Sequence, residues 1–113
     1  MTSKQDVEDL AGRIRPLVSG RGVVEKRMFG GIAFLVNGNM SVSASGNGGL
    51  MLRCEPSQTP ALIAEKGVSR VVMRGREMDG WIRVEPSVVS DAAGLERWVR
   101  VGVAYARSLP PKD

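Results

Sequence analysis

Residues 26–40 read KRMFGGIAFLVNGNM, in which Met, Phe and two glycines stand between a basic pair and an apolar run. Two explanations compete: a Gly-rich loop that holds a phosphate or another ligand, or a backbone turn or bulge from which a strand begins. Gly30-Gly31 lacks the GxGxxG spacing and precedes a strand pattern, so no helix N-terminus follows that would bind phosphate. We favour the structural explanation, with Met28 and Phe29 packed against a sheet; the alternative is an exposed Met-Phe patch that binds a partner protein.

The surrounding segment, residues 23–54, has the two-residue period of strands. A three-residue loop at Asn37-Gly38-Asn39 and a flexible loop at Ser45–Gly49 (SGNGG) would pair its large apolar residues on one face. The expected pairs are Val36–Met40, Phe34–Val42, Ile32–Ala44, Ala44–Leu50, Val42–Leu52 and Met40–Cys54. The sequence therefore predicts a three-stranded meander, and residues 23–28 are a candidate extra strand before it.

The chain before the strands has helical periodicity. Its apolar residues recur at spacings of three and four, namely Val7, Leu10, Ala11, Ile14, Leu17 and Val18. Ser3 and Asp6 match a capping box, and glycines at 20 and 22 end the segment. Pro16 should bend or shorten the last turn, because it lacks an amide hydrogen.

The second half of the chain predicts a short helix and a hairpin. In SQTPALIAEKG, Thr59 is the expected cap, Pro60 the first helical residue and Gly67 the residue after the end. A hairpin over Ser69–Glu85 would turn at Asp79-Gly80. One face would then carry Val71, Met73, Ile82 and Val84, and the other Arg74, Arg76, Met78, Trp81, Arg83 and Glu85. This register sets two like charges, Arg76 and Arg83, opposite each other; a longer loop starting at Gly75 would separate them.

A last helix should begin near Ser90 and Asp91 and end before Pro110-Pro111. Its expected buried stripe is Leu95, Trp98, Val99, Gly102, Val103 and Ala106. Arg97, Arg100 and Arg107 would form its outer face. Together these elements predict an α+β fold in two layers, an antiparallel sheet (meander plus hairpin) packed by helices in the order α-β(3)-α-β(2)-α.

Composition places the chain among ordinary soluble globular proteins, with 42% hydrophobic and 25% charged residues. Its 113 residues suit a single domain, residues 1–113. The start does not resemble a secretory signal, and no apolar run approaches the roughly 18 residues of a membrane helix. The only cysteine, Cys54, has no partner for a disulfide and is expected to be a small buried hydrophobe. We therefore expect a cytoplasmic protein without membrane contact.

The absence of histidine removes the commonest general base and metal ligand. No compact carboxylate cluster replaces it, so we predict no enzyme activity, no metal and no cofactor. The net charge of +4 and the pI near 9.8 suit an anionic partner only weakly, because the basic residues are scattered. Their composition, twelve Arg and four Lys, hints at a GC-rich bacterial genome.

One surface is the candidate binding face: Arg74, Arg76, Trp81 and Arg83. Basic side chains interleaved with an aromatic ring can hold a nucleic-acid strand by phosphate contacts and stacking. The same residues also suit a solvated sheet face with an Arg stacked on Trp81, or part of a dimer interface. These alternatives stay open at this stage.

A family likeness rests on a basic residue, Met-Phe-Gly-Gly, an apolar strand, an Asn-Gly turn and a strand that ends at Arg. The matching residues are Arg27, Met28, Phe29, Gly30, Gly31, Ile32–Val36, Asn37-Gly38 and Leu50–Arg53. With the closing LERWVRVGVAYARSLPPK, the chain resembles the N-terminal domain of the TfoX/Sxy competence-regulator family. The resemblance implies a two-layer α+β domain with a regulatory rather than catalytic role. Family members that regulate competence carry a second, C-terminal domain, and we expect this chain to be a single-domain member without it.

Two functions lead as hypotheses, ahead of a third, an enzyme that uses carboxylates or a recruited cofactor. The first is a non-catalytic regulatory or adaptor domain that acts through protein contacts, with a protein partner or a second copy as its target. The alternative is a nucleic-acid-binding module that uses the Arg/Trp candidate binding face.

Overall fold

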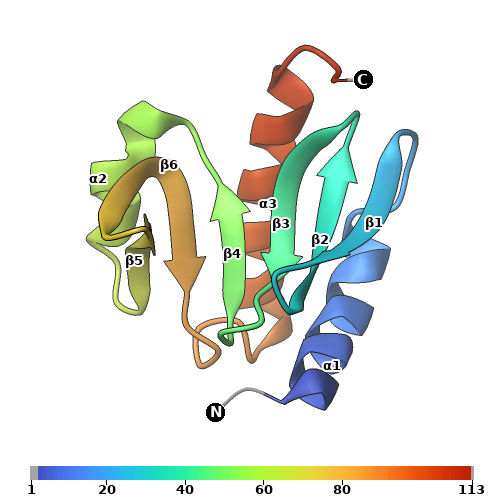
Figure 1. The fold of residues 1–113 in the computed structure, drawn as a ribbon, viewed down its shortest axis with the longest axis horizontal. Helices are drawn as coiled ribbons and strands as arrows, with labels where there is room; N and C mark the ends of the chain where they lie inside the picture. Colours follow the sequence, from blue (N-terminus) through green and yellow to red (C-terminus); the bar gives the residue numbers. More distant parts are fainter. Residues whose placement is uncertain (1–2, 113) are drawn as a thin grey trace.

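The protein is described over residues 3–112 by a computed structural model (Figure 1). A six-stranded antiparallel sheet has the strand order β1-β2-β3-β4-β6-β5. The elements in chain order are α1 (Lys4–Ile14), η1 (Arg15–Leu17), β1 (Val23–Met28), β2 (Gly31–Val36), β3 (Asn39–Ala44), β4 (Leu50–Arg53), η2 (Pro56–Gln58), α2 (Thr59–Ile63), β5 (Val68–Met73), β6 (Arg76–Val84) and α3 (Ala92–Ser108). The predicted α+β class is confirmed, and the candidate extra strand forms as β1.

The hydrophobic core lies between the sheet and two of the helices. Figure 1 shows α3 behind the strands and α1 beside them at the lower right. The strand residues buried in this core include Phe34, Val42, Leu52, Ile82 and Val84. Trp98, only 1% exposed, is the largest fully buried side chain of α3, as its position in the helical stripe predicts.

Local signals set the ends of the two long helices. The Asp6 amide donates to Ser3 Oγ at 3.0 Å and the Ser3 amide to Asp6 Oδ2 at 3.1 Å, which is the predicted capping box. Pro16 lies in η1, directly after α1, so the expected shortening of the helix is confirmed. Asp91 caps α3 by accepting a hydrogen bond from the Gly94 amide at 3.2 Å. Within residues 3–112, no helix combines the length and apolarity needed to cross a bilayer.

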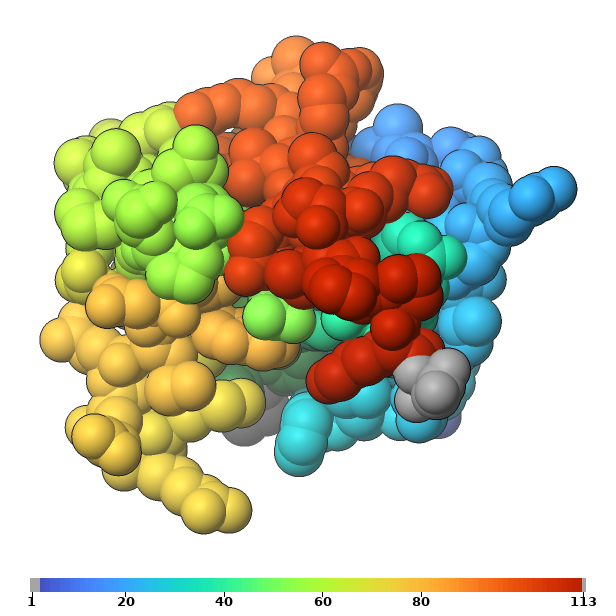
Figure 2. Space-filling model, turned by 90° about the horizontal axis from the view of Figure 1, so that it is seen from above, coloured from blue at the N-terminus to red at the C-terminus, as the bar shows by residue number. Residues whose placement is uncertain are grey.

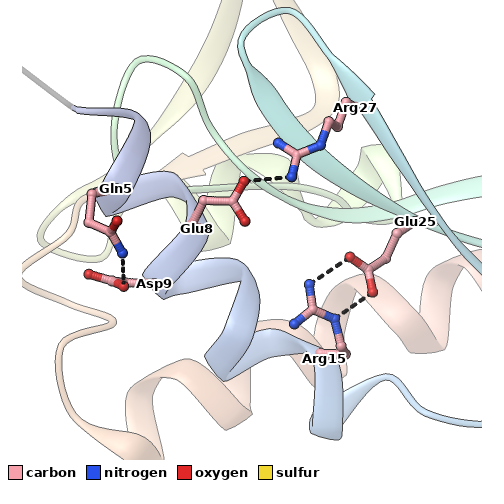
Figure 3. Close-up of polar contacts among 6 residues, drawn as sticks. All are labelled: Gln5, Glu8, Asp9, Arg15, Glu25 and Arg27. Carbon is pink, nitrogen blue, oxygen red and sulfur yellow. Dashed lines mark hydrogen bonds and ion pairs between the residues drawn. The ribbon is translucent and has the colours of Figure 1, made fainter.

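Ion pairs attach the edge strand β1 to the helix layer (Figure 3). Arg27 Nη2 lies 2.6 Å from Glu8 Oε2 of α1. Arg15 of η1 binds Glu25 of β1 in two places, Nε to Oε2 at 2.5 Å and Nη2 to Oε1 at 2.8 Å. Because side chains alternate along a strand, Glu25 and Arg27 face the helices, while Lys26 and Met28 face the opposite side of the sheet.

The meander pairs as predicted in its centre but not at its ends. The pairs Ile32–Ala44, Phe34–Val42, Val42–Leu52 and Ala44–Leu50 are confirmed. Asn37-Gly38, with φ of 53° and 83°, forms a two-residue turn, so Val36 lies opposite Asn39. A bulge then leaves Ser41 unpaired, and its hydroxyl donates to the Phe34 carbonyl at 2.7 Å.

This bulge corrects two predictions about Met40. Met40 lies opposite Leu35 rather than Val36. The Met40–Cys54 pair does not form either, because β4 ends at Arg53 and the Cys54 amide donates to the Gly80 carbonyl at 2.9 Å. The three-residue loop was therefore wrong by one residue, and Met40 moves to the other face of the sheet from the core.

The second hairpin turns at a different place from the one predicted. Arg74 and Gly75, with φ of 52° and 77°, form the turn between β5 and β6. Asp79-Gly80 lies inside β6, at a register shift between Arg70–Ile82 and Val71–Met78. Arg76 consequently pairs with Met73 and not with Arg83, so the expected repulsion is absent. The alternative loop near Gly75 was closer to the observed turn.

Thr59 explains why Asp79-Gly80 is not a turn. Thr59 was predicted to cap α2, but it is fully buried and the helix has no side-chain cap. Its Oγ1 instead accepts a hydrogen bond from the Gly80 amide at 2.8 Å and lies 3.8 Å from Cys54 Sγ. A buried contact across the chain thus holds Gly80 within the strand and overrides the local turn signal.

Candidate functional site

The sequence Met28-Phe29-Gly30-Gly31 forms the hairpin turn between β1 and β2. Phe29 and Gly30 have φ of 51° and 76°, the left-handed backbone that both central residues of a type I′ turn adopt. A Cβ at Gly31 would clash with the Ala44 carbonyl, so the chain needs glycine at this position. The structural explanation for the glycines is confirmed.

Phe29 does not pack against the sheet as predicted. Its side chain is 87% exposed, the highest exposure among the large hydrophobic residues. A type I′ turn favours Asn, Asp or Gly, and a left-handed backbone costs other residues about 1–2 kcal/mol. An aromatic residue therefore occupies a strained position and buries little surface in return.

Phe29 stands at the edge of an apolar groove on the face of the sheet that the helices leave open. The groove has a volume of about 330 Å³. Strands β2, β3, β4 and β6 supply its floor, with Leu35, Met40, Met51 and Trp81. Met28 and Phe29 form one wall, and Val71, Val72 and Met73 of β5 form the other. We call this surface the methionine groove, because four of the six methionines line it.

The β5–β6 hairpin makes the groove concave. In Figure 2 the yellow residues of this hairpin project beyond the rest of the molecule at the lower left, and a recess separates them from the cyan segment. Val72 and Met73 on this hairpin are 62% and 43% exposed. Methionine side chains are flexible and polarizable, so they adapt to an apolar surface of irregular shape.

The structure separates the residues of the candidate binding face into two groups. Trp81 lies in the groove floor, and Arg83 follows two residues later on the same side of β6. Arg83 is already engaged, since its Nη2 donates to the carbonyls of Asn47 and Gly48 at 2.7 and 2.8 Å. Arg74 and Arg76 lie apart from them at the hairpin tip, where both are exposed.

Arg53 is the arginine that stacks on Trp81. The guanidinium carbon of Arg53 lies 5.0 Å from the centre of the Trp81 ring and 5.3 Å from that of Tyr105 on α3. Its Nε is buried and has no hydrogen-bond partner among the described residues. Two aromatic rings therefore fix this cation next to the groove, through cation–π contacts.

The remaining residues singled out from the sequence are Cys54 and three arginines of α3, and most of them are buried or paired within the fold. Cys54 is fully buried, and this burial raises the pKa of its thiol, so it is the small hydrophobe that was expected. Arg97 binds Glu65 through two contacts of 2.6 Å, and Arg100 binds Glu96 at 2.6 Å. Arg107 is exposed on α3.

Sequence reasoning missed most of the groove. Leu35 and Met51 alternate with the core residues of their strands, and this out-of-phase pattern is the signal that an apolar second face exists. Met40 and Val72 carry no such signal, because each lies next to a bulge that changes the side of the sheet on which a residue falls. Across residues 3–112, no acidic, basic or thiol side chain lines the methionine groove.

Comparison with known proteins gives a family match. The family model described as the TfoX N-terminal domain matches residues 17–106, which include all six strands. Neither the curated proteins nor the solved structures give a match. The match extends from η1 to the last turn of α3 and covers far more than half of the chain. The chain therefore belongs to the TfoX N-terminal domain family.

Proposed function

We propose that this competence-regulator-type domain is non-catalytic and acts by binding a partner protein through the methionine groove. The observation that carries this proposal is Phe29: an 87% exposed aromatic side chain held in a left-handed turn at the edge of an apolar recess. Stability does not account for such a residue, since Asn or Gly would suit the turn better. Burial against a partner would contribute about 1.5–3 kcal/mol for this side chain alone.

The composition of the groove supports contact rather than catalysis. Catalytic sites need a group that transfers a proton, attacks a substrate or binds a metal. The groove offers mainly apolar and aromatic side chains to a partner, with Ser43, Ser45 and Asn47 as its polar ones. Aromatic residues and Met are enriched at protein interfaces. Flexible Met-rich surfaces also occur in proteins that bind apolar segments of other proteins.

The alternative, nucleic-acid binding, has fewer residues to support it. Arg83 binds loop carbonyls, which leaves Arg74, Arg76 and the Arg53–Trp81 pair. Three phosphate contacts to a single strand would give a slope of about −2 in log affinity against log salt. Nucleic-acid binding would also leave the exposed apolar side chains of Phe29 and Val72 without a role, so protein contact is the better proposal.

Site-specific photocrosslinking tests the proposal. Phe29 is replaced by the photoreactive p-benzoylphenylalanine in one variant and Val72 in a second, each expressed in living bacterial cells. Leu17, which is 41% exposed in the helix layer, carries the same probe in the control variant. We expect one discrete protein adduct with the probes at Phe29 and Val72 and none at Leu17. Equal adducts at all three positions, or adducts with nucleic acid instead of protein, would reject protein binding by this face.

A further inference from the structure

The two layers of the domain differ in charge. The strand positions that face away from the helices carry Lys26, Arg53 and Arg83, and no carboxylate among the described residues of β1 to β4 and residues 81–84 of β6. Arg74 and Arg76 extend this positive surface at the hairpin tip. Neither of these two forms an ion pair with a described residue. Of these five cations, Arg83 is bound to loop carbonyls and Arg53 is stacked on two aromatic rings, which leaves Lys26, Arg74 and Arg76 without such contacts.

The carboxylates that neutralise arginines lie mainly on the helix side. Glu8, Glu65 and Glu96 each hold an arginine there at 2.6 Å. Glu77 and Asp79 of β6 are the acids nearest to the hairpin tip, and both lie within 4.0 Å of Arg70. Lys26, Arg74 and Arg76 form no ion pair with a described residue, so they have free capacity for carboxylates that come from another molecule.

We propose that the partner protein places an apolar segment in the methionine groove and flanks it with aspartate or glutamate residues. The inference rests on the proposed function and adds the chemistry of the partner. An uncharged lining selects apolar side chains for the centre of the contact. The surrounding cations select acidic flanks, because complementary charges speed association and exclude partners of the wrong sign.

A second copy of this chain, docked through its own groove face, would not supply an apolar segment with acidic flanks. Two groove faces brought together would place the cations of one copy opposite those of the other, and the nearest carboxylates, Glu77 and Asp79 of the β5–β6 hairpin, already lie beside Arg70. Like charges in this arrangement repel and disfavour association. Nucleic acid satisfies the cations but leaves Phe29 and Val72 in water. The acidic apolar segment is the occupant that satisfies both parts of the surface.

The test maps the segment that the probe at position 29 captures. Adducts are isolated, digested and sequenced by mass spectrometry, with the Arg74→Glu/Arg76→Glu double variant carrying the same probe for comparison. The matched control is Arg21→Glu/Arg107→Glu, which makes the same change in net charge at two exposed residues away from the groove. Thermal unfolding of each variant confirms that it is folded.

We expect a captured segment with an apolar centre and more Asp and Glu than Lys and Arg in its flanks. The adduct yield should fall roughly tenfold in Arg74→Glu/Arg76→Glu and remain unchanged in the control. A neutral or basic segment, or an unchanged yield in the double variant, overturns the acidic partner while protein binding stands. An adduct with the mass of two copies of this chain overturns it in favour of self-association. Absence of any protein adduct rejects the proposed function itself.

Discussion

At position 29, the residue that would make the turn most stable differs from the phenylalanine that we propose binds a partner. The central positions of type I′ turns accept Asn with little strain, whereas Phe has no local partner for its ring. We therefore expect Phe29→Asn to raise the free energy of unfolding by about 0.5–1 kcal/mol. The same change should remove partner capture by the probe at Val72.

A second turn provides the control for this prediction. Arg74 has nearly the same backbone conformation, with φ of 52°, at the same position of the β5–β6 turn. Arg74→Asn should give a similar gain in stability, measured by urea unfolding, and a smaller loss of capture, because Phe29 remains. A clear loss of stability in Phe29→Asn would show that the ring has a structural role and would contradict our account of the turn.

Single residues also decided how much of the strand pairing could be predicted from the sequence. Phe34, Val42 and Leu52 share the core face as expected, because alternation specifies this face along three strands. Met40 fell on the opposite face because of one unpaired residue, Ser41. Asn37-Gly38 is itself a signal for a two-residue turn, but nothing in the local sequence marks the bulge at Ser41 that follows it. The place of Met40 in the floor of the groove was therefore beyond sequence reasoning.

At the level of elements, two helical glycines have opposite surroundings. Around Gly12 in α1, apart from the adjoining backbone of the helix itself, no atom of residues 3–112 lies within 4 Å of the place where a Cβ would be. Gly102 in α3 packs against β3, where a Cβ would come within 2.6 Å of the Ser41 carbonyl oxygen and of Val42 Cγ1. Glycine at position 102 is thus what allows α3 to approach the sheet closely.

These surroundings predict substitutions of opposite sign. Gly12→Ala should raise the free energy of unfolding by about 0.5–1 kcal/mol, because alanine loses less backbone entropy in a helix. Gly102→Ala should lower it by about 1–2 kcal/mol, since the cost of overpacking exceeds the gain in helix propensity. Urea unfolding of both variants measures the difference. Stabilisation by Gly102→Ala would mean that α3 is not held as closely to β3 as the structure has it.

The hairpin of β5 and β6 shows why element positions are harder to predict than element types. Its strands were expected, and both form. Asp79-Gly80 has the strongest turn signal of the segment, yet the turn lies at Arg74-Gly75. The contact that decides this, from Thr59 to the Gly80 amide, spans 21 residues. Propensity describes only neighbours in the chain, so it could not include this bond.

For the whole molecule, the layered architecture and the family were accessible from the sequence, whereas only part of the proposed binding surface was, namely Trp81 and the possible exposure of Met28 and Phe29. Capping signals, the apolar stripe of α3 and the alternation in β2 to β4 all agree with one another, and such agreement across levels specifies a fold. The charge difference between the layers depends on strand register, and the register was partly wrong. It could be seen only once the observed pairs replaced the expected ones.

Two ion pairs that join separate elements tie the stability of the whole domain to pH. The Arg15 guanidinium lowers the pKa of Glu25 by hydrogen bonding, and Arg97 lowers the pKa of Glu65 in the same way. A carboxyl group with a lowered pKa in the folded state adds stability above its unfolded pKa, and this contribution is lost as the pH falls through the folded pKa. Both pairs are largely exposed, so solvent screens them and each contribution is small.

We therefore expect Arg15→Gln/Arg97→Gln to reduce the dependence of stability on pH. The wild type should be more stable than the double variant at about pH 7, and the two should converge at acid pH below the folded pKa of both carboxyl groups, where each binds a proton in folded and unfolded chains alike. Urea unfolding across this range measures the convergence, and NMR titration should show the pKa of Glu25 and Glu65 rising in the variant. Arg107→Gln, at a residue that forms no ion pair with a described residue, is the control for loss of positive charge. A constant stability difference between wild type and double variant from neutral to acid pH would mean that these pairs do not link the folded state to pH.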